Sequence, residues 1–335
     1  MKGCAAFHKG QIGVLMALVI ATLIGAMALG TDIAVFNLQW GRLQKAADTA
    51  ALAGASELTG DPTTTDNSLV TAAATKYAKL NGIQTSEIVS IAPAANAKSI
   101  TVVLSRNVSY FFLKVLGATS GKVSAKATAA IQPTTGACGF LPIGMPCQFS
   151  DYSKGHSTCG EQYATGKSVN IKADWNNSTQ VPGNWEALSL GRSGGSQFKD
   201  NIAHGYAGPA MPSCAGQKNV NSCPTWINTE TGNLVGPTTQ GFSDRMNGQS
   251  YQTVPTKFDP SNPQIVLAPL VDFKASGKKG GNVSSPILDF VTLWVTAVDG
   301  AGNVTATIIQ PVPGCGTPTT QATQDNGPYV AVLTS

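Results

Sequence analysis

The chain has 335 residues, enough for two ordinary domains, and only 12% of them are charged, about half the usual share. The net charge is +4 and the basic residues do not cluster, so no nucleic-acid partner is expected. The 36 glycines and 19 prolines, with many Ser, Thr and Asn residues, favour an exported protein rich in β-strands and loops.

An apolar run lies near the N-terminus. No side chain from Ile12 to Thr31 is charged, and Lys2 and Lys9 precede the run. The run fits a secretory signal peptide with a small-residue cleavage site at 26–28, and it also fits a membrane anchor that continues through "IAVF". The basic residues before the run place the N-terminus in the cytoplasm under either interpretation.

The residues that follow favour the anchor. The stretch "LQWGRLQKAADTAALAGASEL" contains no proline and is rich in alanine, the residue with the highest helix propensity. We therefore expect one helix from about Ile12 to about Leu58, roughly 70 Å long at ~1.5 Å per residue. Cleavage after Ala28 would cut this helix without evident gain, so we expect the anchor to be retained.

Small residues recur at four-residue steps inside the apolar run. Ala17, Ala21 and Gly25 form one such line, which lets a second helix approach closely. Ala and Gly are also simply common in membrane helices, so the line has an alternative explanation. Asp32 is the one charge at membrane depth; we expect it at the outer interface, in contact with a basic residue of a neighbouring helix.

A second line of small residues lies in the alanine-rich part. Ala47, Ala51 and Ala55 share one helix face, and their side chains are too small to hold two backbones apart. We expect this face to be an interface. Its partner is either the chain's own sheet near Ile100–Leu104 or a helix of another subunit.

Several of these residues form a recognisable pattern. Gly10 and Gln11 precede the apolar run, Asp32 lies near its end, and "LQKAADTAALAGA" occupies Leu43–Ala55. With these residues the segment resembles the N-terminal module of TadE/TadG-like proteins of the tight-adherence (Flp) pilus machinery. The resemblance implies a single-pass anchor in a bacterial inner membrane, uncleaved or minimally processed. It implies other Flp pilus or pilin-like subunits, and membrane lipid, as partners.

Next in the chain comes a short α/β pattern. A second helix is predicted in "NSLVTAAATKYAKLNGI", with Gly82 placed to end it. "EIVSIAP" and "KSITVVLSR" are predicted strands, and a third strand follows a short segment around Phe112 and a turn at Gly117. This order also resembles the family's first extracytoplasmic module, in which one long helix packs against a small sheet, similar to a pilin in outline.

The second region is rich in Gly, Pro, Asn and Ser. Its clear predicted strands are "PQIVLAPLVDF", "PILDFVTLWVTAVDGAGNVTATIIQPV" and "YVAVL", and "DGAGN" is a hairpin signal. Parts of it resemble the C-terminal region of some TadE/TadG-like proteins. The predicted fold class is α+β, divided into a cytoplasmic N-terminus (1–11), a transmembrane helix (12–36), a pilin-like module (37–132) and a mostly β extracytoplasmic domain (136–335).

The cysteines are distributed unevenly. Cys4 precedes the apolar run, and the other six all follow residue 136. An even set on one side of a membrane segment indicates disulfides in an oxidising compartment. Cys214 and Cys223 are the expected pair because they close a short loop, and the other pairings stay open. The six candidates are Cys138, Cys147, Cys159, Cys214, Cys223 and Cys315.

Three motifs suggest chemistry without completing it. "GEQYATGKS" has one residue too many between its glycines for a phosphate-binding loop. "DYSKG" resembles the metal-adhesion motif of von Willebrand A domains but has Gly155 where that motif needs a serine. Cys138, Cys147, His156 and Cys159 lack the usual spacing of a structural zinc site, and disulfides explain these cysteines more simply. We expect no metal or cofactor.

Nor do the remaining polar residues form a catalytic pattern. The acidic residues are dispersed, and neither His156 nor His204 is near a recognisable nucleophile, so we expect no enzyme. Five aromatic residues of the second region could line a binding surface but more often form the core of a loop-rich domain. They are Trp175, Trp185, Trp226, Tyr163 and Tyr206.

The predicted function is therefore a membrane-anchored structural or assembly subunit, similar to a minor pilin, of a tight-adherence pilus. A surface-anchored adhesin with the same anchor is the alternative, and an anchored extracytoplasmic enzyme is a third and weaker one.

Overall fold

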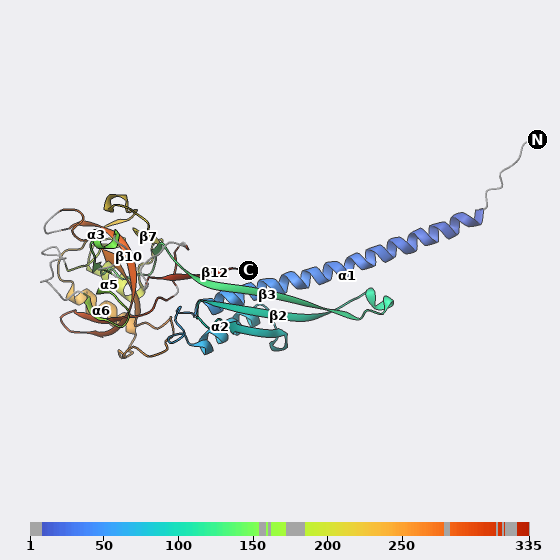
Figure 1. The fold of residues 1–335 in the computed structure, drawn as a ribbon, viewed down its shortest axis with the longest axis horizontal. Coiled ribbons are helices and arrows are strands. Elements are labelled where there is room, and N and C mark those ends of the chain that lie inside the picture. Colours follow the sequence, from blue (N-terminus) through green and yellow to red (C-terminus); the bar gives the residue numbers. More distant parts are fainter. Residues whose placement is uncertain are drawn as a thin grey trace, which may run out of the picture.

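The fold was analysed in a computed structural model, which combines one very long helix with a four-stranded, a six-stranded and a two-stranded sheet (Figure 1). The α+β class predicted from the sequence is confirmed. The structure describes residues 9–153, 159, 162–171, 185–277, 282–312, 314–316, 318 and 327–334.

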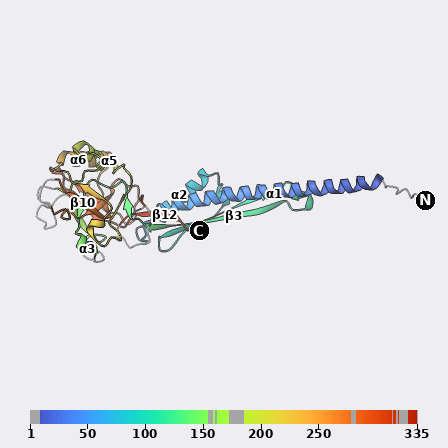
Figure 2. The ribbon, with the colours of Figure 1, turned by 90° about the horizontal axis from the view of Figure 1, so that it is seen from above.

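Helix α1 (Lys9–Ala55) has 47 residues and no break at the small residues 26–28. The predicted single helix is confirmed, although it ends at Ala55 rather than near Leu58. Its last backbone carbonyls are still satisfied, because the Ser56 N–H donates to the Leu52 oxygen at 3.0 Å. The N-terminal half projects away from the rest of the chain, as two perpendicular views show (Figures 1 and 2).

The C-terminal half of α1 belongs to a folded module. Helix α2 (Asn67–Leu80) lies beside it, begun by Asp66, whose carboxylate accepts a hydrogen bond from the Ser68 N–H at 2.9 Å. The strands are β1 (Ile88–Pro93), β2 (Ser99–Ser109) and β3 (Ser120–Pro133), with the short 3-10 helices η1 (Thr85–Glu87) and η2 (Leu113–Leu116) between them. Helix α2, the three strands and η2 are close to the segments predicted from the sequence, whereas η1 was not predicted.

The sheet of this module contains a fourth strand from the far end of the chain. Its order is β1-β2-β3-β12, and β12 (Tyr329–Leu333) pairs antiparallel with β3, with Tyr329 opposite Pro133. The sequence correctly indicated a strand here but assigned it to the second domain, and that assignment is corrected. The second domain is thus an insertion between two neighbouring strands of the first sheet.

The inserted domain is built around a long central strand. Strand β10 (Ser284–Val298) is buried over most of its length and lies between β9 (Ile265–Val271) and β11 (Val304–Ile308). The predicted "DGAGN" hairpin connects β10 to β11, with the Asp299 carboxylate accepting from the N–H groups of Ala301 and Asn303.

Short strands and helices surround this sheet. Strands β5 (Met145–Pro146) and β6 (Ser168–Ile171) are its edges, and β8 (Trp226–Asn228) pairs with the start of β10. Helices α5 (Gly195–His204) and α6 (Val235–Met246) pack against each other, where Gly241 lets α6 approach Ile202. The remaining elements are α3 (Phe149–Ser153), η3 (Val220–Ser222), β4 (Gly136–Ala137) and β7 (Met211–Pro212).

Three disulfides join the six cysteines of the inserted domain. Cys214–Cys223 is the predicted short-loop pair, and Cys147–Cys159 also closes a local loop. Cys138–Cys315 spans 177 positions and links the two chain segments that enter and leave the insertion. In the same region Thr134 hydrogen-bonds to the Pro328 carbonyl and forms an isolated bridge with Pro318, so the junction is held by covalent and hydrogen bonds together.

Two glycines of α1 provide a matched test of its packing. A Cβ at Gly54 would lie 2.5 Å from Ile100 Cδ1 and 3.2 Å from Ala74 Cβ, whereas nothing lies within 4 Å of one at Gly41. Gly54→Ala should lower the free energy of unfolding, because overpacking costs about 1–3 kcal/mol and outweighs the gain in helix propensity. Gly41→Ala should raise it by up to ~1 kcal/mol. Thermal unfolding of the full chain in detergent measures both, and stabilisation by Gly54→Ala would contradict the close packing.

The disulfide pattern can be checked without mutation. Alkylation without reductant should label Cys4 alone, and peptide mapping of the unreduced protein should recover the Cys138–Cys315 crosslink. A crosslink from Cys138 to any other cysteine, or labelling of all seven, would contradict the junction described above.

Candidate functional site

The exposed half of α1 presents a long apolar surface. From Val14 to Leu38 its large hydrophobic side chains are mostly half or more exposed, and Met27 reaches 69%. Within the described residues it is the one helix long and apolar enough to cross a membrane. The rise from Gly13 to Asp32 is about 29 Å at ~1.5 Å per residue, close to a hydrocarbon core of ~30 Å.

The predicted line of small residues lies on this exposed half. Ala17, Ala21 and Gly25 are exposed, and nothing lies within 4 Å of a Cβ built on Gly25. The structure contains a single chain, so the role of this line as a helix interface stays a prediction.

Asp32 has partners within its own chain that the sequence did not predict. Its side chain is only 3% exposed, and its carboxylate accepts hydrogen bonds from three consecutive backbone N–H groups. They belong to Phe111 (2.7 Å), Phe112 (2.9 Å) and Leu113 (2.7 Å), in the turn between β2 and β3. Within the chain the carboxylate thus binds the backbone at the start of η2, where amides point outward without partners. The expected contact with a basic residue of a neighbouring helix stays a prediction.

The turn that Asp32 holds is closed by its own residues. Gly117 adopts φ +89°, which favours glycine, and its N–H donates to the Lys114 carbonyl at 3.1 Å. Beside this turn the rings of Phe36 and Tyr110 stack with centroids 6.4 Å apart, so the hairpin contacts α1 one turn beyond Asp32 as well. A side chain at Gly121 would overlap the hydroxyl end of Tyr110, so the Tyr110 ring would have to move to accommodate it.

The alanine face of α1 packs against the sheet of the same chain. Ala47, Ala51 and Ala55 are completely buried, in one cluster with the side chains of Ile100 and Val102 on β2. Strand β3 contributes more small residues to this cluster, which allows the helix backbone to approach the sheet closely. Of the two partners left open by the sequence, the structure selects the internal sheet.

Arg106 of β2 forms an ion pair with Glu87 of η1 and a hydrogen bond with Gln39 of α1. The Arg106 guanidinium donates to both carboxylate oxygens of Glu87, at 2.5 and 3.0 Å, and to the Gln39 side-chain oxygen at 2.9 Å. These hydrogen bonds from Arg106 lower the pKa of Glu87, although partial burial opposes them. The bidentate geometry fixes both partners in position.

The motifs of the inserted domain have structural roles. Lys167 and Ser168 lead into strand β6, not into the helix N-terminus that a phosphate-binding loop requires. Asp151 lies in the short helix α3. Cys138, Cys147 and Cys159 are in disulfides, and His156 lies outside the described residues. No group of three potential metal ligands occurs among the residues that the structure describes.

Aromatic and acidic side chains of this domain mostly support its core. Tyr163 is buried and its hydroxyl donates to the Pro146 carbonyl at 2.8 Å; burial raises the pKa of this phenol. Tyr206 packs against Phe140, with ring centroids 5.5 Å apart. Asp272, also buried, accepts from the Phe149 N–H at 3.0 Å. Trp185 and Trp226 are half-buried, and Trp175 lies outside the described residues.

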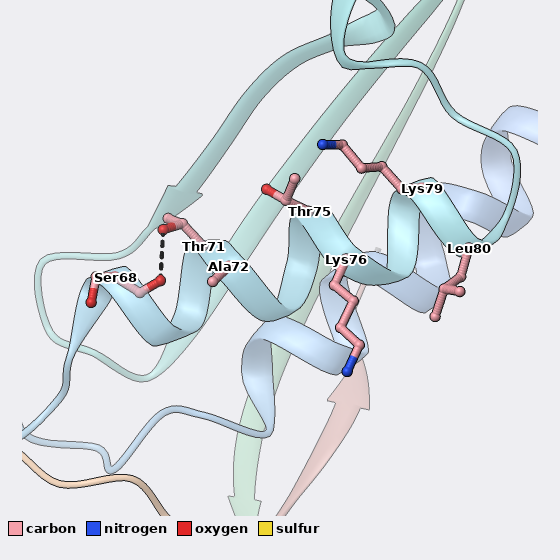
Figure 3. Close-up of a pocket in the computed structure, with 7 residues that line it drawn as sticks. All are labelled: Ser68, Thr71, Ala72, Thr75, Lys76, Lys79 and Leu80. Carbon is pink, nitrogen blue, oxygen red and sulfur yellow. Dashed lines mark hydrogen bonds between the residues drawn. The ribbon is translucent and has the colours of Figure 1, made fainter.

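The outer face of α2 forms an open surface region. Its lining consists of side chains from this one helix, including Lys76, Lys79 and Leu80 (Figure 3). Leu80 is 70% exposed and the Thr71 hydroxyl is bonded to the Ser68 carbonyl of the preceding turn. A face formed by a single helix is convex and does not enclose a ligand.

The hairpin turn was missed as a functional feature at the sequence level. Its motif "FF-x-x-V-L-G" was visible, but its importance depends on the contact with Asp32, some 80 residues earlier in the chain. Phe111 and Val115 are exposed by 77% and 87%, which is unusual for a turn.

Comparison with known families agrees with the resemblance carried by the N-terminal residues. The Tad family model, described as putative Flp pilus-assembly TadE/G-like, matches residues 10–57. No curated protein and no solved structure matched the chain. The match covers α1 and the first residues after it, which is the segment that holds both the exposed apolar half and the buried alanine face.

The clamp formed by Asp32 can be tested by mutation. Asp32→Ala removes the acceptor of three amides, and each buried donor left unsatisfied costs about 1–3 kcal/mol if water cannot reach it. We expect faster hydrogen exchange at Phe111, Phe112 and Leu113, and a lower melting temperature of the detergent-solubilised chain.

Asp32→Asn is the matched control, since it keeps one acceptor oxygen and should give an intermediate effect. Unchanged exchange at these amides in Asp32→Ala would show that the clamp does not hold the turn.

Proposed function

We propose that this chain, whose residues 10–57 match the Tad family, is a membrane-anchored structural subunit of a Flp-type pilus assembly system. The observation that carries the proposal is the continuity of α1. One unbroken helix is exposed and apolar in its first half and forms the core of a folded module in its second. Removal of the first half as a signal peptide would detach the module from the membrane.

The proposed orientation follows from charge and cysteine distribution. The N-terminus, with Lys2 and Lys9, would be cytoplasmic, and the chain would cross the bacterial inner membrane once. The inserted domain with its three disulfides would then be extracytoplasmic, where disulfides persist. Cys4 would remain on the reducing side.

In this arrangement the chain acts by position and not by catalysis. The alanine face fixes α1 to the sheet, β12 and the junction disulfide fix the inserted domain to that sheet, and the inserted domain lies at the end opposite the N-terminus (Figure 1). A rigid connection of this kind suits a minor-pilin-like subunit that docks beside other membrane helices through Ala17, Ala21 and Gly25.

The position of the inserted domain, far from the N-terminus, is also compatible with one alternative function, that of an adhesin. A domain held away from the membrane on a rigid stalk would also suit an adhesin that binds an external ligand. Normal pili on cells that lack this chain, together with lost adhesion, would support the adhesin.

Retention of the anchor is the first test. Mass spectrometry of the mature protein should find the residues of α1 present. A start at Leu29 would contradict the proposal, whereas a start at Gln11 would show processing after Gly10 and leave the anchor intact.

Co-purification tests the docking line. Ala21→Leu adds bulk where a second helix would pack, at a cost of about 1–3 kcal/mol for overpacking, and should reduce recovery of other pilus components with the tagged chain. Ile20→Leu conserves volume at a neighbouring exposed position and should not. Equal recovery with both variants, from equally membrane-bound protein, would exclude this line as the interface.

A further inference from the structure

The connection between β2 and β3, residues 110–119, is here called the hairpin tip. Hairpin connections in water usually consist of Gly, Asn, Asp, Pro and Ser. The hairpin tip instead presents Phe111 (77% exposed), Phe112 (38%) and Val115 (87%), and Val115 is the most exposed large hydrophobic side chain in the described part of the chain. An apolar group so exposed requires an explanation from its surroundings.

The hairpin tip lies at the end of the apolar span. Through the three hydrogen bonds to Asp32 it is held beside the residue at which the uncharged stretch of α1 ends. Figure 1 shows the β2–β3 ribbon extending along α1 toward its N-terminal half. If α1 crosses a bilayer over residues 13–31, the hairpin tip is therefore at the outer surface of that bilayer.

We propose that the hairpin tip is a second membrane contact, seated in the interfacial layer of the bilayer that α1 crosses. The proposal rests on the proposed function only for the membrane anchoring of α1. Phe side chains occur on the lipid-facing side of protein segments that lie in this layer, and burial of Phe or Val there removes apolar surface from water.

The backbone of the hairpin tip is prepared for such an environment. A loop that enters lipid must satisfy its own N–H groups, because no water is available to do so. Asp32 accepts from three of them, and the N–H groups of Val115, Gly117 and Ala118 donate to carbonyls of the same turn. The carboxylate is in turn shielded, which makes a charge at this depth tolerable.

Basic side chains near the hairpin tip support a lipid bilayer as its partner. Lys114 lies between the apolar residues of the hairpin tip, and Lys122 follows on β3; both are exposed. Long basic side chains can extend to phosphate head groups while their neighbours enter the apolar layer. On α1 itself, Ile33 and Val35 also remain exposed beyond Asp32.

Two contacts with one bilayer restrict the molecule more than one does. A single helix can rotate about its axis and tilt, whereas a helix with a laterally attached hairpin tip has one preferred rotation. The inserted domain would then be presented in a defined direction, as required for docking beside other subunits.

Environment-sensitive labels test the proposal on the full chain. In a Cys4→Ser background, Val115→Cys, Val89→Cys and Leu23→Cys are each labelled with a nitrobenzoxadiazole dye and reconstituted in phosphatidylethanolamine/phosphatidylglycerol vesicles that contain nitroxide lipids. Val89 on β1 is 59% exposed and is the matched control away from the hairpin tip; Leu23 reports on the anchor itself. We expect blue-shifted emission and several-fold stronger lipid quenching at positions 115 and 23 than at 89.

The outcomes separate the two proposals. Quenching at 23 but not at 115 would overturn the hairpin-tip contact and leave the anchor standing. A blue shift at 115 without lipid quenching would mean that protein covers the tip, which also overturns it. Absence of quenching at 23 would overturn the anchor and the hairpin-tip contact together.

Discussion

The close packing of α1 on the β2–β3 ribbon determines the rest of this structure. Alanines at 47, 51 and 55 have no exposed surface, and small residues of β3 pack in the same buried cluster. Small side chains on both sides bring backbone close to backbone, so many weak dispersion contacts add up over a long interface. The helix continues without a break from this interface into its apolar half.

Asp32 extends this attachment beyond the module core. A carboxylate near the end of an apolar helix would be costly if left alone, and three backbone amides in a turn would be costly as well. The carboxylate supplies the hydrogen-bond acceptor that the amides need, and the amides supply the donors that the carboxylate needs. The pairing explains why the sequence has an acidic residue inside an otherwise uncharged stretch and why the β2–β3 hairpin reaches so far along the helix.

The inserted domain is tied to the same framework at both of its ends. Strand β12 returns to pair with β3, and Cys138–Cys315 joins the entering and leaving segments. A further hydrogen bond, from Gln310 to Asp61 at 3.3 Å, connects the domain to the loop after α1. The second domain therefore follows the orientation of the first, and whatever fixes α1 in a membrane also orients the surface that the chain displays.

Much of this followed from local sequence patterns. The correctly predicted features depend on residues that lie close together in the chain. Alanine propensity and apolar periodicity predicted helices α1 and α2 and strands β1 to β3. A turn signal predicted the Asp299 hairpin, and a short loop predicted the Cys214–Cys223 pair. The family resemblance likewise rested on one contiguous segment, and the match to residues 10–57 agrees with it.

The tertiary structure alone decided which distant segments meet. Periodicity showed that Tyr329–Leu333 is a strand but not that its partner is β3, because any free strand edge offers the same hydrogen bonds. The alanine face indicated an interface without naming its partner, since small residues suit any close neighbour. The sequence predicted a basic partner for Asp32 because an acidic side chain at membrane depth is expected to pair with an opposite charge. Backbone amides carry no sequence signal, and only the fold placed those of Phe111, Phe112 and Leu113 beside Asp32.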